Sequence, residues 1–95
     1  MMFHMEQEIA LLLENNPNWI LEKNTLVGNW KVADFAMLRQ LVGELCDLAD
    51  ELNHHPTVTY GYNTLRVETT THDAGNTITT KDMELATAVS KLVGE

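Results

Sequence analysis

The sequence is poor in cysteine, in basic residues and in long apolar runs. Its single cysteine, Cys46, has no partner for an intramolecular disulfide and cannot supply a Cys-based metal motif. Six basic residues stand against fourteen acidic ones, which gives a formal net charge of −8. Because this charge repels phosphate backbones and anionic lipid surfaces, we expect no direct nucleic-acid binding and no membrane association.

The missing apolar runs argue against a membrane-spanning or exported protein, and the scarcity of serine argues against an enzyme with a serine nucleophile. No run approaches the ~18 residues that a membrane-spanning helix needs, and residues 1–5 carry no signal-type apolar segment. With one cysteine and no export signal, the sequence predicts a cytoplasmic protein. Ser90 is the only serine, and both Ser90 and Cys46 fall inside helical patterns. Neither residue fits nucleophilic catalysis from a strained turn.

What is present fits one soluble globular domain over residues 1–95, with 44% hydrophobic residues. Periodicity and turn residues predict helices at 6–15, 35–54 and 80–93, and strands at 19–21, 25–32, 57–62 and 65–71. This order predicts an α+β fold, in which three helices pack on one face of a four-stranded antiparallel sheet. Gly28 either weakens its strand or marks a close approach of backbone or ligand.

The longest helical pattern begins at Asp34, a good N-cap, and runs to about His54. Its apolar stripe is wide, and its outer side keeps Met37, so we expect part of it to pack on another subunit. We expect Cys46 to be buried or half-buried in this helix. We also expect the second and fourth strands to leave an unpaired sheet edge.

Candidate functional side chains lie where these elements end. Pro56 disfavours the α conformation for His55, so the helix should end at about His54 and turn the two imidazoles in different directions. His72 follows the fourth strand, and Asp82 lies in the first turn of the last helix. Each has a structural explanation as well: a histidine at a helix end or in a loop, or an aspartate that closes the capping box Thr79-x-x-Asp82.

Together, these residues suggest acid–base chemistry at one rim of the sheet. Imidazole has an unperturbed pKa of ~6.5, so histidines that converge on one cleft can serve as acids and bases near neutral pH. Two adjacent histidines and a distant third match no established metal-ligand spacing such as His-Glu-x-x-His. The sequence therefore predicts neither a metal nor another cofactor.

The spacing of these residues resembles a known family. Asp50-x3-His54-His55-Pro56, then Tyr62 after five residues, His72 after nine more and Asp82 after a further nine resemble the signature of the pterin-4a-carbinolamine dehydratases. The resemblance extends along the whole chain, through Val32-Ala33-Asp34-Phe35, Thr71-His72-Asp73 and Asp82-x-x-Leu85-Ala86. The family's fold, a four-stranded antiparallel sheet backed by three helices, agrees with the predicted order.

Three positions depart from the family pattern. Val58 and Met83 stand where the family often has tryptophan, and Gly28 stands where a basic residue is common. These departures leave the histidines intact but affect ring stacking and substrate preference.

The resemblance implies roles for the candidate residues. The catalytic group would be His54, His55 and His72, with His54 and His72 as the acid–base pair and His55 holding and orienting the pterin. The substrate-binding set would be Asp50, Pro56, Tyr62, Thr71 and Asp82. Within that set, the two carboxylates would fix histidine tautomers or bind the pterin edge, and Tyr62 would form a wall.

The resemblance also implies a reaction and partners. The substrate would be a 4a-hydroxytetrahydropterin, left when an aromatic amino acid hydroxylase has used its cofactor, and the products would be quinonoid dihydropterin and water. The chain would form a homodimer or homotetramer. Animal members of the family also bind a helical dimerisation segment of a hepatocyte transcription factor, so a protein-binding scaffold is one alternative. Action on another pterin, for example in molybdopterin metabolism, is another.

Overall fold

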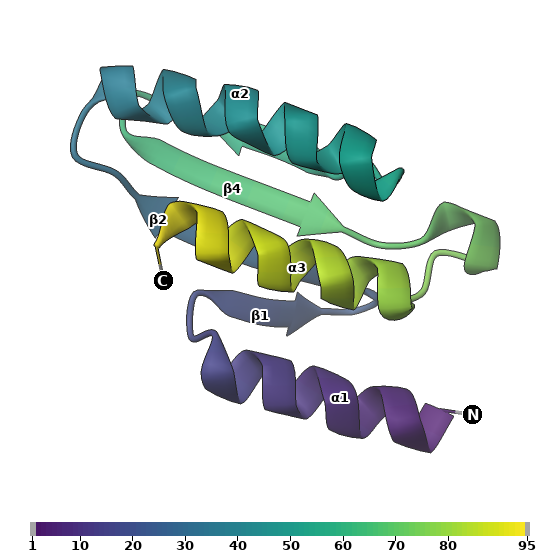
Figure 1. Ribbon diagram of the computed structural model, residues 1–95. Helices are drawn as coiled ribbons and strands as arrows, with labels where there is room; N and C mark the ends of the chain where they lie inside the picture. The colour runs from purple at the N-terminus through teal and green to yellow at the C-terminus, as the bar shows by residue number, and fades with distance from the viewer. Residues whose placement is uncertain (1, 95) are drawn as a thin grey trace.

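The computed structural model describes residues 2–94, with side chains from Met5 onward. Its elements are α1 (Met2–Asn15), β1 (Trp19–Glu22), β2 (Thr25–Lys31), α2 (Phe35–Leu52), β3 (Thr57–Tyr60), β4 (Thr64–Thr69), the short 3-10 helix η1 (His72–Ala74) and α3 (Thr80–Val93). The antiparallel sheet and the α-β-β-α-β-β-α order confirm the predicted α+β fold. Buried residues of all three helices join one core cluster against the sheet (Figure 1).

The strand order in the sheet is β1-β2-β4-β3, so β1 and β3 form its edges. The expectation that the second and fourth strands leave an unpaired edge was therefore wrong. These two strands pair with each other over six residues each, from Leu26 opposite Thr69 to Lys31 opposite Thr64. The long connection through α2 lets the β3–β4 hairpin dock on β2 through β4, which leaves β3 outside.

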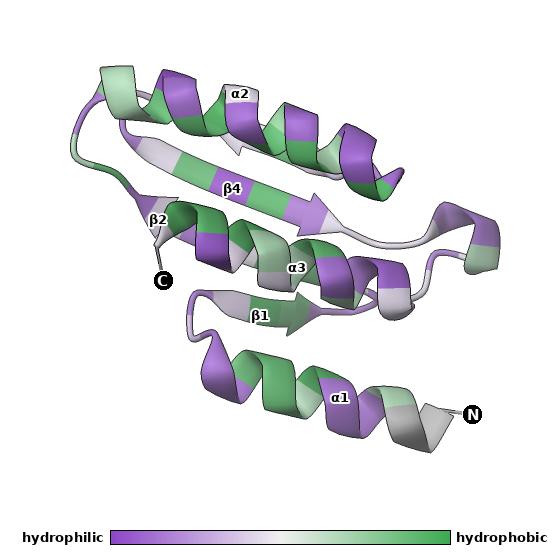
Figure 2. Cartoon of the chain, in the orientation of Figure 1, coloured by the Kyte–Doolittle hydropathy of each residue, from purple (hydrophilic) through white to green (hydrophobic). Residues whose placement is uncertain are grey.

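The core lies between the sheet and the helices. Along β4, inward-facing Leu65 and Val67 alternate with outward-facing polar residues, as the coloured bands of Figure 2 show. Trp19 and Trp30 meet edge to face, with ring centroids 5.3 Å apart. A Cβ on Gly28 would lie 2.7 Å from Cζ3 of Trp30 and 2.9 Å from Cε2 of Trp19. The glycine thus marks a close approach of two indole rings to the strand.

The ends of α2 show where local chemistry sets a boundary. Asp34 caps the helix as expected, because its Oδ1 accepts a hydrogen bond from the N–H of Met37 at 2.9 Å. The other end differs from the prediction. Asn53 adopts the left-handed conformation with φ of 53° and donates its N–H to the carbonyl of Asp50. The helix therefore ends at Leu52, and His54 already lies beyond it.

Two further expectations need correction. Cys46 is exposed on α2, because the apolar stripe of the helix turns its neighbours Leu45 and Ala49 inward instead. The turn between β3 and β4 comprises residues 61–63, so Tyr62 lies in the turn and not in a strand. Within residues 2–94, no helix combines the length and apolar character needed to cross a bilayer.

Candidate functional site

The C-terminal end of α2, the end of β4 and the start of α3 lie at the same end of the molecule, with η1 beyond them (Figure 1). A hollow of about 310 Å³ opens there. Its lining comprises Asn53, His54, His55, Thr70, Thr71, His72, Asp73 and Lys81. The structure therefore brings together all three histidines that the sequence singled out. A larger hollow of about 520 Å³, lined by residues such as Asn29, Thr59 and Arg66, contains no histidine.

His54 is anchored on a buried carboxylate. Its Nε2 lies 2.7 Å from Oδ1 of Asp82, a residue 28 positions later in the chain. The His54 side chain is 11% exposed and that of Asp82 is fully buried. The capping box predicted for α3 is present, since the N–H of Thr79 donates to Oδ2 of Asp82 at 2.9 Å. Asp82 thus caps α3 and holds His54 at once.

Two threonines complete the surroundings of this carboxylate. The hydroxyl of Thr69 donates to Oδ1 of Asp82 at 2.5 Å, and that of Thr71 donates to Oδ2 at 2.6 Å. Burial alone raises the pKa of the Asp82 carboxyl, but the hydrogen bonds from Thr69, Thr71, His54 and the Thr79 backbone outweigh burial and hold that pKa below its ordinary value. The carboxylate is therefore ionised at neutral pH. Its Oδ1 accepts from His54 and Thr69, and its Oδ2 accepts from Thr71, from the N–H of Thr79 and, at 3.5 Å, from the Thr79 hydroxyl. Because both of its oxygens are occupied, Asp82 is suited to hold His54 in place and not to contact a substrate directly.

The other two histidines have partners at the surface. Nε2 of His55 lies 2.9 Å from Oδ1 of Asp50, and both side chains are largely exposed, at 62% and 80%. Nδ1 of His72 lies 2.6 Å from the amide oxygen of Asn76. Asn76 itself has a left-handed backbone with φ of 57°, a conformation that asparagine tolerates better than most residues. Each of the three imidazoles is thus held at one ring nitrogen.

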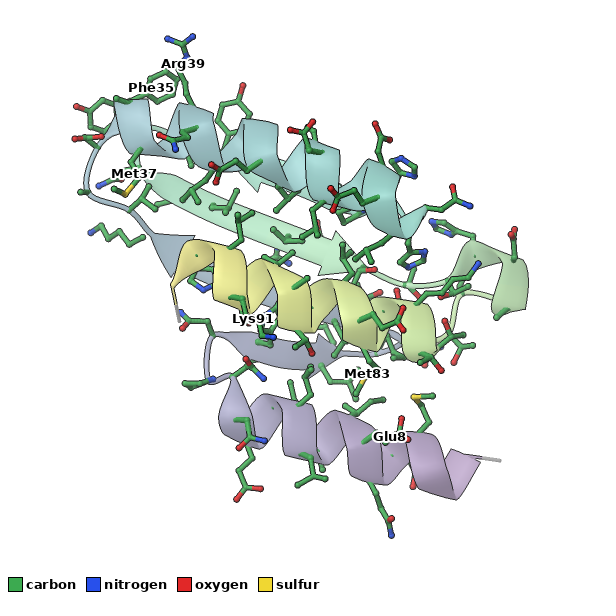
Figure 3. All side chains as sticks on the ribbon, in the orientation of Figure 1. Glu8, Phe35, Met37, Arg39, Met83 and Lys91 are labelled. Carbon is green, nitrogen blue, oxygen red and sulfur yellow. The ribbon has the colours of Figure 1, made fainter. Side chains whose placement is uncertain are left out.

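The remaining predicted residues are placed differently. Pro56 is half-buried between His55 and β3, and Thr71 lines the hollow while its hydroxyl is committed to Asp82. Tyr62 stacks on Phe35, with ring centroids 6.2 Å apart. Phe35 begins α2 (Figure 3), whose 18 residues span about 27 Å. The structure does not bring Tyr62 to the hollow within one chain.

Several residues of this site were missed from sequence, among them Thr69, Asn76 and Lys81. Thr69 had a signal, because it is a polar residue at an inward-facing strand position after Leu65 and Val67. Asn76 lay in a loop whose composition indicates only turns, and Lys81 was an ordinary surface residue of a helix start. Within residues 5–94, whose side chains are described, no three His, Cys, Asp or Glu residues are grouped so as to hold a metal ion. The chain itself therefore supplies imidazole, carboxylate and ammonium groups here.

Comparisons with known proteins bear on this arrangement. Two solved structures share the fold. One is described as a transcriptional coactivator/pterin dehydratase from Brucella melitensis, with a TM-score of 0.84 and 24% identity over 94% of this chain and 96% of its own. The other is a pterin dehydratase-like protein identified as a RuBisCO assembly factor in the alpha-carboxysome, with a TM-score of 0.67 and 17% identity over 81% of this chain and 88% of its own.

Sequence relatives are closer. A protein of Chloroflexus aurantiacus that bears the name pterin-4-alpha-carbinolamine dehydratase is 39% identical over 94% of this chain and 95% of its own. A protein of the same name from Prochlorococcus marinus is 32% identical over 93% and 92%. The family model described as pterin 4 alpha carbinolamine dehydratase matches residues 4–92. The chain therefore belongs to the pterin 4 alpha carbinolamine dehydratase family.

Proposed function

We propose that the protein dehydrates a 4a-hydroxytetrahydropterin to the quinonoid dihydropterin and water. Membership of the family supports a pterin dehydratase function. The observation that carries the finer proposal is the hollow at the end of α2, where three imidazoles are each held at one nitrogen by an acceptor of the chain.

The reaction needs two proton transfers. The C4a–O bond breaks as the departing oxygen takes a proton and leaves as water, and a ring nitrogen of the pterin loses a proton as the new C=N bond forms. Imidazoles can perform both transfers near neutral pH. His54 and His72 are assigned to these transfers, and His55 to holding the pterin. Asp82 and Asp50 orient His54 and His55 respectively. This dehydration would form part of the recycling of a pterin cofactor.

The activity is tested with purified protein and a 4a-hydroxytetrahydropterin, by following the ultraviolet change on formation of the quinonoid product. We expect a rate above that of the uncatalysed reaction across pH 6–9, a range that includes the imidazole pKa of ~6.5. Equal rates with and without protein at every pH would overturn the proposed enzyme function.

Single replacements then separate the roles of the histidines. His54→Ala or His72→Ala should lower kcat by roughly 10²–10⁴, or ~3–5 kcal/mol of barrier, with little change in KM. His55→Ala should chiefly raise KM. Thr87→Ala, an exposed site on α3, is the control. Unchanged kcat in both His54→Ala and His72→Ala, with folding verified by circular dichroism, would contradict the assignment.

A second candidate function, protein binding, rests on a different part of α2. Exposed Phe35 and Met37 lie in its first turn (Figure 3). Phe35, Arg39 and Tyr60 help to line a hollow of about 270 Å³. A chain without turnover on any pterin would favour this scaffold function. Turnover only with pterins carrying other side chains would instead favour a role such as molybdopterin metabolism.

A further inference from the structure

We infer that Thr69 and Asn76 are positioning residues, which decide the ring nitrogen that His54 and His72 present to the hollow. Thr69 acts through Asp82 and leaves Nδ1 of His54 open, whereas Asn76 acts directly and leaves Nε2 of His72 open. The consequence for turnover rests on the proposed function, but the orientation of the two rings does not.

The orientation of His54 follows from the chemistry of its partner. An ionised carboxylate has no proton to give, so the nitrogen that faces Oδ1 of Asp82 at 2.7 Å must carry the proton. In the neutral ring the other nitrogen, Nδ1, then has a free lone pair. Nδ1 has no hydrogen-bond partner among the described residues, and it is not sealed from solvent as the indole N–H of Trp30 is. It is the nitrogen of His54 that a substrate can reach.

Thr69 fixes the oxygen on which this orientation depends. Its side chain is buried in β4 at 2% exposure, and its hydroxyl reaches the same Oδ1 atom that His54 contacts. Thr71 and the Thr79 backbone hold the other oxygen. Without the Thr69 hydroxyl, Oδ1 would keep His54 as its sole partner, and only the bonds to Oδ2 would fix the direction in which Oδ1 faces the ring. A threonine at an inward strand position after Leu65 and Val67 is thereby explained.

The orientation of His72 is set from the opposite nitrogen. The amide oxygen of Asn76 can only accept, so Nδ1 of His72, at 2.6 Å, carries the proton and Nε2 has the lone pair. The Nδ1–H form is the less populated tautomer of free histidine, so the loop selects it. The left-handed backbone of Asn76, which follows the left-handed Gly75, carries the amide back over the η1 histidine.

The choice of nitrogen matters for proton transfer. The same nitrogen accepts a proton when the ring is neutral and donates it when the ring is charged, so one orientation serves either half of an elimination. Presenting the other nitrogen would displace the reacting atom by more than ~1 Å, a misplacement that can cost about 10²-fold in rate.

The test uses 15N NMR of the labelled full-length protein at about pH 8.5, two units above the imidazole pKa of ~6.5, where free imidazole is neutral. Protonated and unprotonated ring nitrogens have well-separated shifts. We expect the Nε2–H form for His54 and the Nδ1–H form for His72. The opposite tautomer at either ring in the wild-type protein would overturn the inference for that ring.

Four variants then act as controls for one another. Thr69→Val should give both tautomers at His54 and leave the tautomer of His72 unchanged. Thr69→Ser, which keeps the hydroxyl, should show the wild-type tautomers at both rings. Asn76→Gly, which keeps the left-handed backbone, should give both tautomers at His72 alone. Asn76→Asp, which keeps an acceptor oxygen, should show the wild-type tautomer at His72. In each disruptive variant kcat should fall by roughly 10²-fold with little change in KM.

The outcomes are distinguishable. Unchanged tautomers in Thr69→Val and Asn76→Gly would overturn the positioning roles. If Thr69→Val fails to fold, the exposed loop variant Asn76→Gly still decides the case of His72. Thr69→Ala, which also removes the hydroxyl, then decides that of Thr69: mixed tautomers support its role and unaltered tautomers overturn it. Correct tautomers in a protein without turnover would uphold the orientation and contradict only the proposed function.

Discussion

Asp82 shows how a single carboxylate can be kept ionised inside a small protein. Burial of an unpaired charge is costly, and here several donors, including the hydroxyls of Thr69 and Thr71, offset that cost. An amide at this position would place an NH2 group against donors. We expect Asp82→Asn to lower the free energy of unfolding by roughly 3 kcal/mol at pH 7, measured by urea denaturation. Asp50→Asn, at an exposed carboxylate, is the matched control and should change little.

The same residue predicts a pH dependence of stability. The pKa of Asp82 is lower in the folded chain than in the unfolded chain, where it is ~3.9. Its stabilising contribution is therefore complete above about pH 4 and is lost as the pH falls through the folded-state pKa. The difference in unfolding free energy between wild type and Asp82→Asn should shrink below about pH 4. A difference that stays constant from pH 7 to pH 2.5 would contradict this account.

Sequence reasoning succeeded where the contact is local in the chain. The cap at Asp34 and the capping box at Asp82 depend on neighbours three positions away, so spacing alone predicts them. The partner of His54 depends instead on the end of α2 meeting the start of α3, and that of Thr69 depends on β4 meeting α3. No local pattern reports either pairing. Thr69 was missed for this reason, although its inward position after two apolar residues was a usable signal.

Among the elements, α3 is tied to β1 by a buried polar contact. The indole N–H of Trp19 donates to the hydroxyl of Ser90 at 2.8 Å, and both side chains are buried. Ser90→Ala would leave this N–H without an acceptor in the core. We expect a loss of about 1–3 kcal/mol in unfolding free energy, measured by chemical denaturation.

The control for Ser90→Ala lies on the same helix. Thr87→Ala removes an exposed hydroxyl that donates to the carbonyl of Met83 one turn earlier, so we expect a change within about 0.5 kcal/mol. Equal losses in the two variants would mean that the buried contact contributes nothing specific.

Element types were predictable because hydrophobic periodicity is strong in each segment, whereas the ends were less so. The helical pattern continues past Leu52, but Asn53 adopts a left-handed conformation and ends α2 before either histidine. Tyr62 continues the alternation of β3, yet the two strands close earlier through residues 61–63. In both places a turn of the backbone overrides the pattern of side chains.

At the scale of the whole molecule, the strand order leaves β1 and β3 with unpaired edges. Such edges are often covered by a second copy of the chain, and the outer side of α2 also exposes Met37. We expect a closed homo-oligomer, a dimer or a tetramer, by light scattering at micromolar concentration. A strictly monomeric mass would refute this prediction.

Two variants identify the edge that is used. Tyr60→Lys places a charge on the β3 edge and Ile20→Lys places one on the β1 edge; both side chains are exposed in the single chain. We expect Tyr60→Lys to lower the mass and Ile20→Lys to leave it unchanged, because Tyr60 adjoins the hollow beside α2. The reverse result would move the interface to β1.

The N–H of Thr79 donates to the same carboxylate that holds His54, and this has a consequence for hydrogen exchange. Its proton can exchange with deuterium only when Asp82 turns away from the cap, whereas amides in the middle of β4 exchange when the sheet itself opens. Comparing the two rates yields the free energy of breaking the Asp82–Thr79 contact separately from that of unfolding, in a sample that contains no substrate.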